Sequence, residues 1–393
     1  MNVVATCDNW GVPVAPEPVI PLVRTQRISS LDGLRGVAAL VVVIHHALLV
    51  IPTLAQPYMA GYAPVDGVYG WLLYSPLHLV WAGTEAVYVF FVLSGLVLAR
   101  SVIGNPHFSW LAYFPSRLVR LYLPVAGAVV LAALSIAVVP RVGDASLWVL
   151  FHPSEYPAAT FLKDLVLVEG TSNVITPLWS LQWEVLFSLL LPVFVIVARG
   201  RWLWATIAVS LVLTTLGYYT GVLFVAFMPM FAIGVALAFQ WDRVEEAFRG
   251  ITGRRAGWLV WPVILIVAGL MLCSYWLLFP YAETGMLTTA TRPVILVGAV
   301  LAVLAAALWE PLRRVLSSRP IQWLGLISFS LYLVHDPVVV AFAYVFDGSR
   351  WAVPFAIVVS IAVAVAFFLV IERPSHRLSQ SLRRALARRE GGL

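Results

Sequence analysis

Long runs of apolar residues, separated by short polar segments, recur along nearly the whole chain. A helix of about 20 apolar residues crosses the hydrocarbon core of a bilayer. Only helices and closed barrels satisfy the backbone hydrogen bonds in lipid, and continuous apolar runs indicate helices. We therefore predict about ten transmembrane helices, near residues 34–52, 82–99, 118–140, 177–198, 202–219, 222–240, 257–279, 292–309, 321–346 and 351–371.

The basic residues are divided unevenly between the segments that join these runs. If the N-terminus is cytoplasmic, 21 of the 25 Lys and Arg residues fall on the cytoplasmic side, and Arg141, Lys163, Arg292 and Arg350 fall on the outer side. Cytoplasmic loops are enriched in Lys and Arg. The asymmetry therefore predicts that both termini are cytoplasmic. It also explains the formal charge of +6 by membrane topology, so we expect no nucleic-acid partner.

Composition agrees with a membrane protein. Hydrophobic residues make up 61% of the chain and charged residues 11%, and the mean hydropathy is +0.92, whereas soluble domains carry about 25% charged residues. We predict an all-α integral protein of the plasma (inner) membrane, with its membrane domain at 27–374. A disordered cytoplasmic tail at 1–26, which lacks the pattern of a signal peptide, and a basic cytoplasmic tail at 375–393 are expected to flank it. The two cysteines lie far apart and suggest neither a disulfide nor a metal site.

Two segments on the predicted outer side, near 53–81 and 141–176, are long and rich in aromatic residues. Loops of this length are uncommon unless they are functional. The aromatic side chains fit an interfacial belt, and they fit equally well a surface that binds an acceptor through stacking on sugar rings. Both interpretations stay open at this point.

Arg35 and His46 form the first candidate site. They are eleven residues apart in the first predicted helix, which returns them to within about 20° of the same face and separates them by about 16 Å along the axis. A buried imidazole is the commonest general base. Arg35 near the cytoplasmic mouth could hold an anionic phosphate, while His46 lies deep. Alternatively, Arg35 reaches the interface and His46 only bonds a neighbouring helix.

Arg117 and Arg120 lie one turn apart at the inner end of the third predicted helix, so both can meet one anion. Guanidinium groups bind phosphate through paired hydrogen bonds. Together with Arg35, they would suit the phosphates of CoA. The alternative is the ordinary basic anchor at a cytoplasmic helix end.

Glu184 lies about two turns inside its apolar helix, close to the depth estimated for His46. A carboxylate there could orient or charge-balance an imidazole, or could simply bond its Trp and Ser neighbours. His335 and Asp336 lie in the outer half of the ninth helix, with Tyr332 one turn earlier. His335 and Tyr332 are candidates for substrate binding, and a structural hydrogen-bond network is the alternative.

Two further residues complete the candidate substrate-binding set. Ser94 lies near the middle of the second helix beside Gly95, where small residues permit close helix approach, and no base is evident that would make it a nucleophile. Trp179 belongs to the segment LWSLQWE, which ends at Glu184. Glu372 and Arg373, in the segment IERP, are expected to be a structural pair at the cytoplasmic side.

These segments together resemble the acyltransferase family 3 of multi-pass membrane proteins. The resemblance rests on LDGLRGVAALVVVIHH, FFVLSGLVLA, the pair Arg117 and Arg120, LWSLQWE, ISFSLYLVH and IERP, which span residues 27 to 374 in the family's order. The sequence departs from the family's usual tyrosine at Phe329 and from its usual phenylalanine at Leu96. Both substitutions retain apolar bulk, so we expect them to change little.

The resemblance implies about ten helices, a cytoplasmic acyl-CoA donor, with acetyl-CoA the expected form, and a need for Arg35 and His46. We therefore expect an O-acyltransferase that modifies a sugar, envelope glycan, lipid or secondary metabolite, with no metal. Some members carry a further extracytoplasmic domain that is not evident here, so the chain is expected to act alone or with a separate partner. The alternative function is a transporter or flippase with a buried His/Glu proton relay, although no paired repeats are evident.

Overall fold

The computed structural model describes residues 28–61, 64–105, 107–167, 170–198, 202–252, 257–282 and 284–390. Within these ranges the chain is helical, with short 3-10 and π turns and no strand. The expected disordered tail at 1–26 lies outside the described residues.

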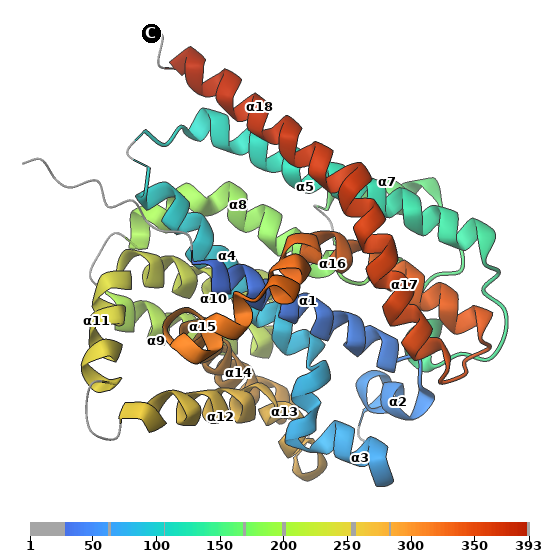
Figure 1. Ribbon diagram of the computed structural model, residues 1–393. Helices are drawn as coiled ribbons and strands as arrows, with labels where there is room; N and C mark the ends of the chain where they lie inside the picture. Colours follow the sequence, from blue (N-terminus) through green and yellow to red (C-terminus); the bar gives the residue numbers. More distant parts are fainter. Residues whose placement is uncertain are drawn as a thin grey trace, which may run out of the picture.

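Eight helical segments are long and apolar enough to cross a membrane, and most run roughly side by side (Figure 1). This confirms the all-α membrane fold. The segments are α1 (Ser29–Leu48), α4 (Gly83–Ile103), α5 (Trp110–Val138), α8 (Leu178–Ala198), α9 (Leu203–Thr220), α14 (Thr284–Leu308), α16 (Arg319–Val345) and the continuous Ala352–Arg388.

Two bent helix pairs account for the remaining two predicted spans. Helix α10 (Leu223–Phe239) meets α11 (Trp241–Thr252) at 76°, and Gly257–Leu272 (η2 and α12) meets Ser274–Tyr281 (α13 and η3) at 62°. The count is therefore eight to ten spans, in agreement with the prediction of about ten.

Several boundaries differ from those predicted. Helix α5 begins at Trp110, eight residues before the predicted start at 118, so Arg117 lies about two turns inside it. Helix α14 begins at Thr284, so Arg292 lies within the helix, where we had expected an outer segment. The added turns of α14 are rich in small and polar residues, and those of α5 are mainly aromatic, with Pro115, Ser116 and Arg117 before the longer apolar run.

The two long aromatic segments contain short helices. The first holds α2 (Pro52–Ala60), α3 (Gly67–Tyr74) and η1 (Pro76–Trp81), and the second holds α6 (Leu147–Leu150) and α7 (Ala158–Val166). Both segments connect spans at the end of the bundle where α1 finishes. Figure 1 shows this for α2 and α3. A further short helix, α15 (Glu310–Leu316), precedes α16.

The crossing of α1 and α16 positions the candidate site. A Cβ on Gly36 would lie 2.4 Å from the backbone nitrogen of Gly325, and one on Gly325 would lie 2.4 Å from the carbonyl oxygen of Asp32. The two helices therefore approach through their glycines, as small residues allow in membrane proteins. This crossing brings the C-terminal end of α1 against the middle of α16.

The end of the chain is one long helical segment. Helix α17 (Ala352–Phe367) passes through a π-helical turn, η4 (Phe368–Glu372), into α18 (Arg373–Glu390). Helix α18 packs along α5 (Figure 1), where Ser375 and Ser379 donate hydrogen bonds to carbonyl oxygens of α5. The basic segment expected at 375–393 is thus helical through residue 390, and its cytoplasmic location stays a prediction.

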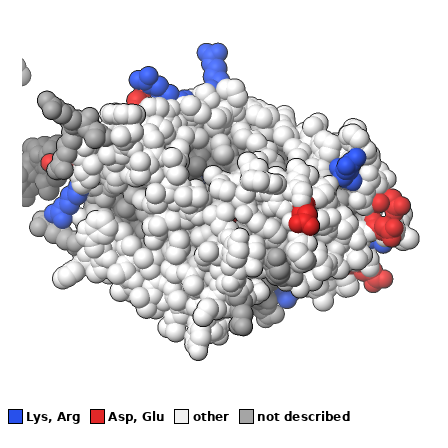
Figure 2. Space-filling model, turned by 90° about the horizontal axis from the view of Figure 1, so that it is seen from below, with Lys and Arg blue, Asp and Glu red and all other residues white. Residues whose placement is uncertain are grey.

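The outer surface of the bundle suits contact with lipid. Figure 2 shows a face that is covered mainly by uncharged side chains, with most of its charged residues toward the edges. Large apolar side chains such as Val197, Trp204 and Val358 are more than half exposed. In water such a surface would be unfavourable, whereas in a bilayer it is the expected exterior. The protein is therefore a multi-pass membrane protein.

Candidate active site

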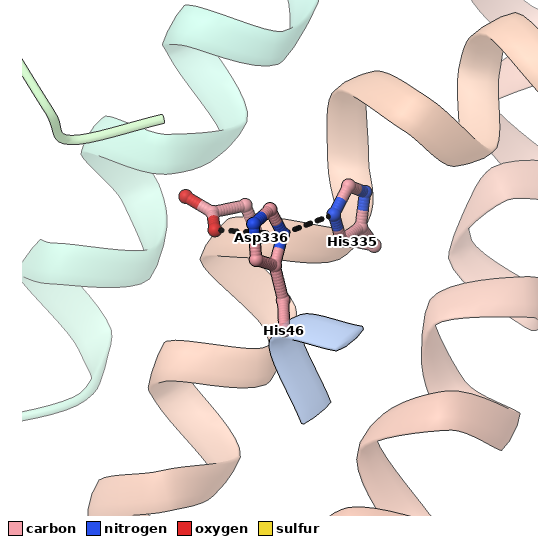
Figure 3. Close-up of side chains that lie close together, drawn as sticks. All are labelled: His46, His335 and Asp336. Carbon is pink, nitrogen blue, oxygen red and sulfur yellow. Dashed lines mark hydrogen bonds and ion pairs between the residues drawn. The ribbon is translucent and has the colours of Figure 1, made fainter. Parts of the chain in front are cut away.

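His46 lies near the C-terminal end of α1 and points at α16 (Figure 3). Its Nδ1 is 2.8 Å from Nε2 of His335 and 3.6 Å from Oδ1 of Asp336. Its ring is nearly parallel to the rings of His335 and Trp148, at centroid distances of 5.0 and 5.1 Å. The hydrogen bond to His335 and the contact with Trp148 restrain the imidazole in one orientation. The structure therefore places the predicted base, His46, beside the predicted substrate-binding residue His335.

The hydrogen bonds set the direction of the protons in this pair. Nδ1 of His335 lies 2.8 Å from the carbonyl oxygen of Leu331, and a carbonyl can only accept, so this nitrogen carries the hydrogen. Nε2 of neutral His335 is then an acceptor, and Nδ1–H of His46 donates to it. This leaves the lone pair of His46 on Nε2, and no described residue hydrogen bonds to that atom. A restrained imidazole with a free lone pair can act as a general base.

Asp336 is the buried carboxylate of this centre. Its Oδ2 accepts from the backbone N–H of Thr176 at 2.8 Å and lies 3.3 Å from Nε2 of His152, and its Oδ1 accepts from the hydroxyl of Thr176 at 2.9 Å. Buried charges require partners of this kind. With Oδ1 close to His46, Asp336 can stabilise the positive charge that His46 gains with a proton. The positions of His152 and Thr176 follow from the folding of the second aromatic segment, so periodicity within the helices could not reveal them.

Arg35, Arg117 and Arg120 line one cavity, as their expected shared role requires. The cavity holds about 910 Å³ of space, including open solvent at its mouth. We call it the arginine pocket. Its other walls are formed by α4, α8, α16 and the η4–α18 segment, at Phe90, Phe91, Ser94, Val97, Leu98, Leu121, Ser180, Leu181, Glu184, Ser328, Phe329, Tyr332, Glu372 and His376.

Glu184 does not lie beside His46, and the expected pairing of these two residues is wrong. It forms an ion pair with Nη2 of Arg117 at 2.7 Å, while Nε of Arg117 donates to Ser188. Because α5 begins earlier than predicted, Arg117 lies deep enough to meet Glu184. Asp336, which directly follows His335 in the sequence, occupies the place next to His46 that we expected Glu184 to fill.

Glu372 and His376 also belong to the arginine pocket, and sequence reasoning had assigned Glu372 only a structural pairing with Arg373. The π-helical turn η4 ends at Glu372, whose Oε2 accepts from the backbone N–H and the hydroxyl of Ser330. Nε2 of His376 lies 3.4 Å from its other oxygen. Such π turns often occur at functional sites. The i, i+4 spacing of Glu372 and His376 was the available sequence signal.

Tyr332 lies between the arginine pocket and His46. It lines the pocket, its hydroxyl is 2.6 Å from Oγ of Ser180, and its ring centroid is 6.1 Å from that of His335. Ser94 lines the same pocket, as expected for a substrate contact. Trp179 instead packs against Phe91 and Phe227 and is not among the pocket-lining residues.

His46, His335 and Asp336 offer ligand atoms within 4.8 Å of one another, as a metal site would require. However, two nitrogens bound to one tetrahedral zinc ion at about 2.0–2.1 Å would be separated by about 3.3 Å, whereas His46 and His335 are 2.8 Å apart. The contacts of Asp336 with Thr176 and His152 also occupy both carboxylate oxygens. The geometry fits a hydrogen-bonded pair better than a metal centre.

Known proteins resemble this chain over most of its length. The acyltransferase domain model of acyltransferase family 3 matches residues 28–369. "Acyltransferase MdmB" of Streptomyces mycarofaciens is 28% identical over 336 residues, which cover 80% of each chain. "Putative peptidoglycan O-acetyltransferase YrhL" of Bacillus subtilis (strain 168) is 25% identical, with 88% of this chain aligned.

The alignment covers 54% of YrhL, so this chain spans about half the length of that relative. No solved structure matches the chain. The family match includes the helices that carry His46, His335 and the three arginines of the pocket. The chain therefore belongs to the acyltransferase family 3 of multi-pass membrane proteins, and it is an acyltransferase.

Proposed function

We propose that this protein transfers an acyl group from cytoplasmic acyl-CoA to a hydroxyl of a sugar, envelope glycan, lipid or secondary metabolite. Acetyl-CoA is the proposed donor. The observation that carries the proposal is the placement of two sites along α16, since Tyr332 borders the arginine pocket and His335 holds His46 one turn further on. A donor that spans both sites needs an anionic end and a long flexible arm, and CoA has both.

Arg35 and Arg120 offer their guanidinium groups to the CoA phosphates at the mouth of the arginine pocket, while Glu184 holds Arg117 in place. Phosphate recognition by several arginines provides charge-assisted, paired hydrogen bonds. The pantetheine arm extends past Phe90 and Tyr332, so that the thioester reaches Nε2 of His46.

His46 Nε2 then removes the proton from the acceptor hydroxyl. The hydroxyl oxygen attacks the thioester carbonyl carbon, and the tetrahedral intermediate expels the CoA thiolate. The imidazolium of His46, stabilised by Asp336 at 3.6 Å, returns its proton to the thiolate. Transfer of the acyl group to His46 first, and then to the acceptor, is the two-step variant of the same scheme. General base catalysis of this kind contributes about 10²–10⁴-fold in rate.

The proposal is tested by comparing cells that express the wild type with cells that express His46→Ala, using mass spectrometry of envelope glycans, lipids and small metabolites. We expect the wild type alone to yield a product heavier by one acyl group. Purified protein in nanodiscs should bind acetyl-CoA equally in both forms, because His46 lies outside the arginine pocket.

The control is His107→Ala, which replaces an exposed histidine in the segment between α4 and α5. It should behave as the wild type does. If His46→Ala folds normally and still supports the full level of acylation, or if the wild type does not bind acetyl-CoA, the proposal is wrong.

A further inference from the structure

A second group of polar side chains lies inside the bundle, apart from the arginine pocket and His46. Glu85, in the first turn of α4, is 2% exposed, and Arg292 lies about two turns inside α14. The proposed transfer uses neither residue. Because charges within membrane helices are costly, they usually mark a functional site.

Aromatic rings hold the guanidinium of Arg292. Its central carbon lies 5.2 Å from the ring centroid of Tyr218 and 5.1 Å from that of Tyr275, and such cation–π contacts stabilise the charge. The hydroxyl of Tyr88 donates to the hydroxyl of Tyr218 at 2.7 Å. The hydroxyl oxygen of Tyr218 is the acceptor in this bond, so its own proton points toward a different acceptor.

Two buried atoms of this group have no hydrogen-bond partner among the described residues, Oε2 of Glu85 and Nε of Arg292. The two side chains attract each other electrostatically, yet no ion pair within 4.0 Å joins them in the described part of the chain. Buried polar atoms without partners need an explanation, such as a bound polar group. A hydroxyl can both donate to a carboxylate and accept from an N–H, so a hydroxyl is the kind of group that suits these two atoms.

The group lies close to the catalytic histidine. The ring of His45 is 5.2 Å from that of His46 and 5.0 Å from that of Tyr58, and Tyr58 interacts electrostatically with Glu85 and Arg292. Burial raises the pKa of Tyr58, so its hydroxyl stays protonated, and it lies 3.1 Å from Nε2 of His78. The rings of His45 and Tyr58 thus lie between His46 and the group that contains Glu85 and Arg292.

We propose that Glu85, Arg292 and Tyr218 form a binding site for a hydroxyl of the acceptor, with a sugar ring lying against the tyrosine faces. Oε2 of Glu85 and Nε of Arg292 are themselves buried, whereas the side chains of Tyr218 and Tyr275 are partly exposed, so in this proposal the ligand reaches the two atoms past these rings. The inference rests on the proposed function, since it assigns the acceptor of that reaction to the class of polyhydroxylated, sugar-like molecules.

The test uses the full chain in nanodiscs and the disaccharide of N-acetylglucosamine and N-acetylmuramic acid as the ligand, with saturation-transfer NMR as the readout. We expect binding to the wild type, and about tenfold weaker binding to Glu85→Gln and Arg292→Gln, because each loses a charge-assisted hydrogen bond. Arg350→Gln, which replaces an exposed arginine in the connection between α16 and α17, is the matched control and should bind as the wild type does.

A fully O-methylated disaccharide tests the same site without a substitution, in case a variant does not fold. It lacks hydroxyl donors and should not bind the wild type. Equal binding of the two disaccharides, equal binding to the wild type and to both variants, or no binding to the wild type overturns the inference, and a structural water then fills the site. Acetyl-CoA titrated into the same samples distinguishes this result from a failure of the proposed function, which would show as loss of donor binding in the wild type.

Discussion

At the scale of single residues, the direction of one hydrogen bond decides which atom of His46 can act as a base. His335 accepts from Nδ1–H of His46 because its own Nδ1–H is bound to the carbonyl of Leu331. His335→Phe keeps a flat ring against His46 and removes this acceptor. We expect kcat to fall by about 10- to 100-fold, since the hydrogen bond that orients the base is lost, while the Kd for acetyl-CoA stays unchanged.

Steady-state kinetics together with a donor titration checks this prediction. His335→Asn, whose side-chain carbonyl oxygen can accept a hydrogen bond, should recover part of the rate. A phenylalanine variant with kcat within twofold of the wild type would show that His335 only packs against His46.

The ion pair of Glu184 with Arg117 leads to the opposite kinetic pattern. Glu184→Gln should raise KM for acetyl-CoA by about tenfold, because Arg117 loses the charge-assisted contact that positions it in the arginine pocket. It should leave kcat nearly unchanged, since Glu184 does not contact His46. The control is Glu245→Gln, which breaks an exposed pair of equal length, 2.7 Å, with Arg249. A large loss of kcat without a change in KM would restore the role that we first expected for Glu184.

At the scale of helices, the sequence predicted the spans well and their mutual contacts poorly. Lipid requires long apolar helices, so the apolar runs reveal them directly. Periodicity correctly placed Arg35 and His46 at the two ends of one helix. It says nothing of which neighbouring helix a side chain meets, and for that reason Glu184 was assigned to His46 while Arg117 is its partner. Glu85 escaped notice because it lies at the edge of a predicted span.

The crossing of α1 and α16 is the element contact on which the site depends. Gly36→Ala would place a methyl group 2.4 Å from the backbone of Gly325, and backbone cannot move aside as a flexible side chain can. Overpacking of this kind costs about 1–3 kcal/mol. We therefore expect a lower Tm and lower acyl transfer, because His46 shifts relative to His335.

Thermal unfolding in nanodiscs and the transfer assay measure both effects. Gly250→Ala is the control, because no atom lies within 4 Å of its added methyl group in α11, and alanine favours a helix by about 1 kcal/mol over glycine. Unchanged stability and activity in Gly36→Ala would mean that the helices are free to separate without disturbing the site.

At the scale of the whole molecule, the bundle has two chemically different ends. The arginine pocket lies toward the ends where α1 and α5 begin, whereas His46, Asp336 and the two aromatic segments lie toward the end where α1 finishes. The distribution of charge along the sequence predicted that the arginines and His46 lie toward opposite ends of the bundle, without any information on contacts. The distribution of Lys and Arg is a property of the whole chain, and local errors in helix boundaries barely alter it.

This polarity predicts which end faces the cytoplasm, and cysteine labelling can test it in a variant whose native cysteines are replaced by serine. Arg350→Cys, in the exposed connection between α16 and α17, should react with a membrane-impermeant maleimide in intact cells. Arg249→Cys in α11, whose native side chain is 74% exposed, should react only after the membrane is made permeable. The positive-inside distribution is the physical reason for this expectation. The opposite labelling pattern would place the arginine pocket outside the cell, where it could not draw on cytoplasmic acyl-CoA, and the proposed route of the donor would have to be abandoned.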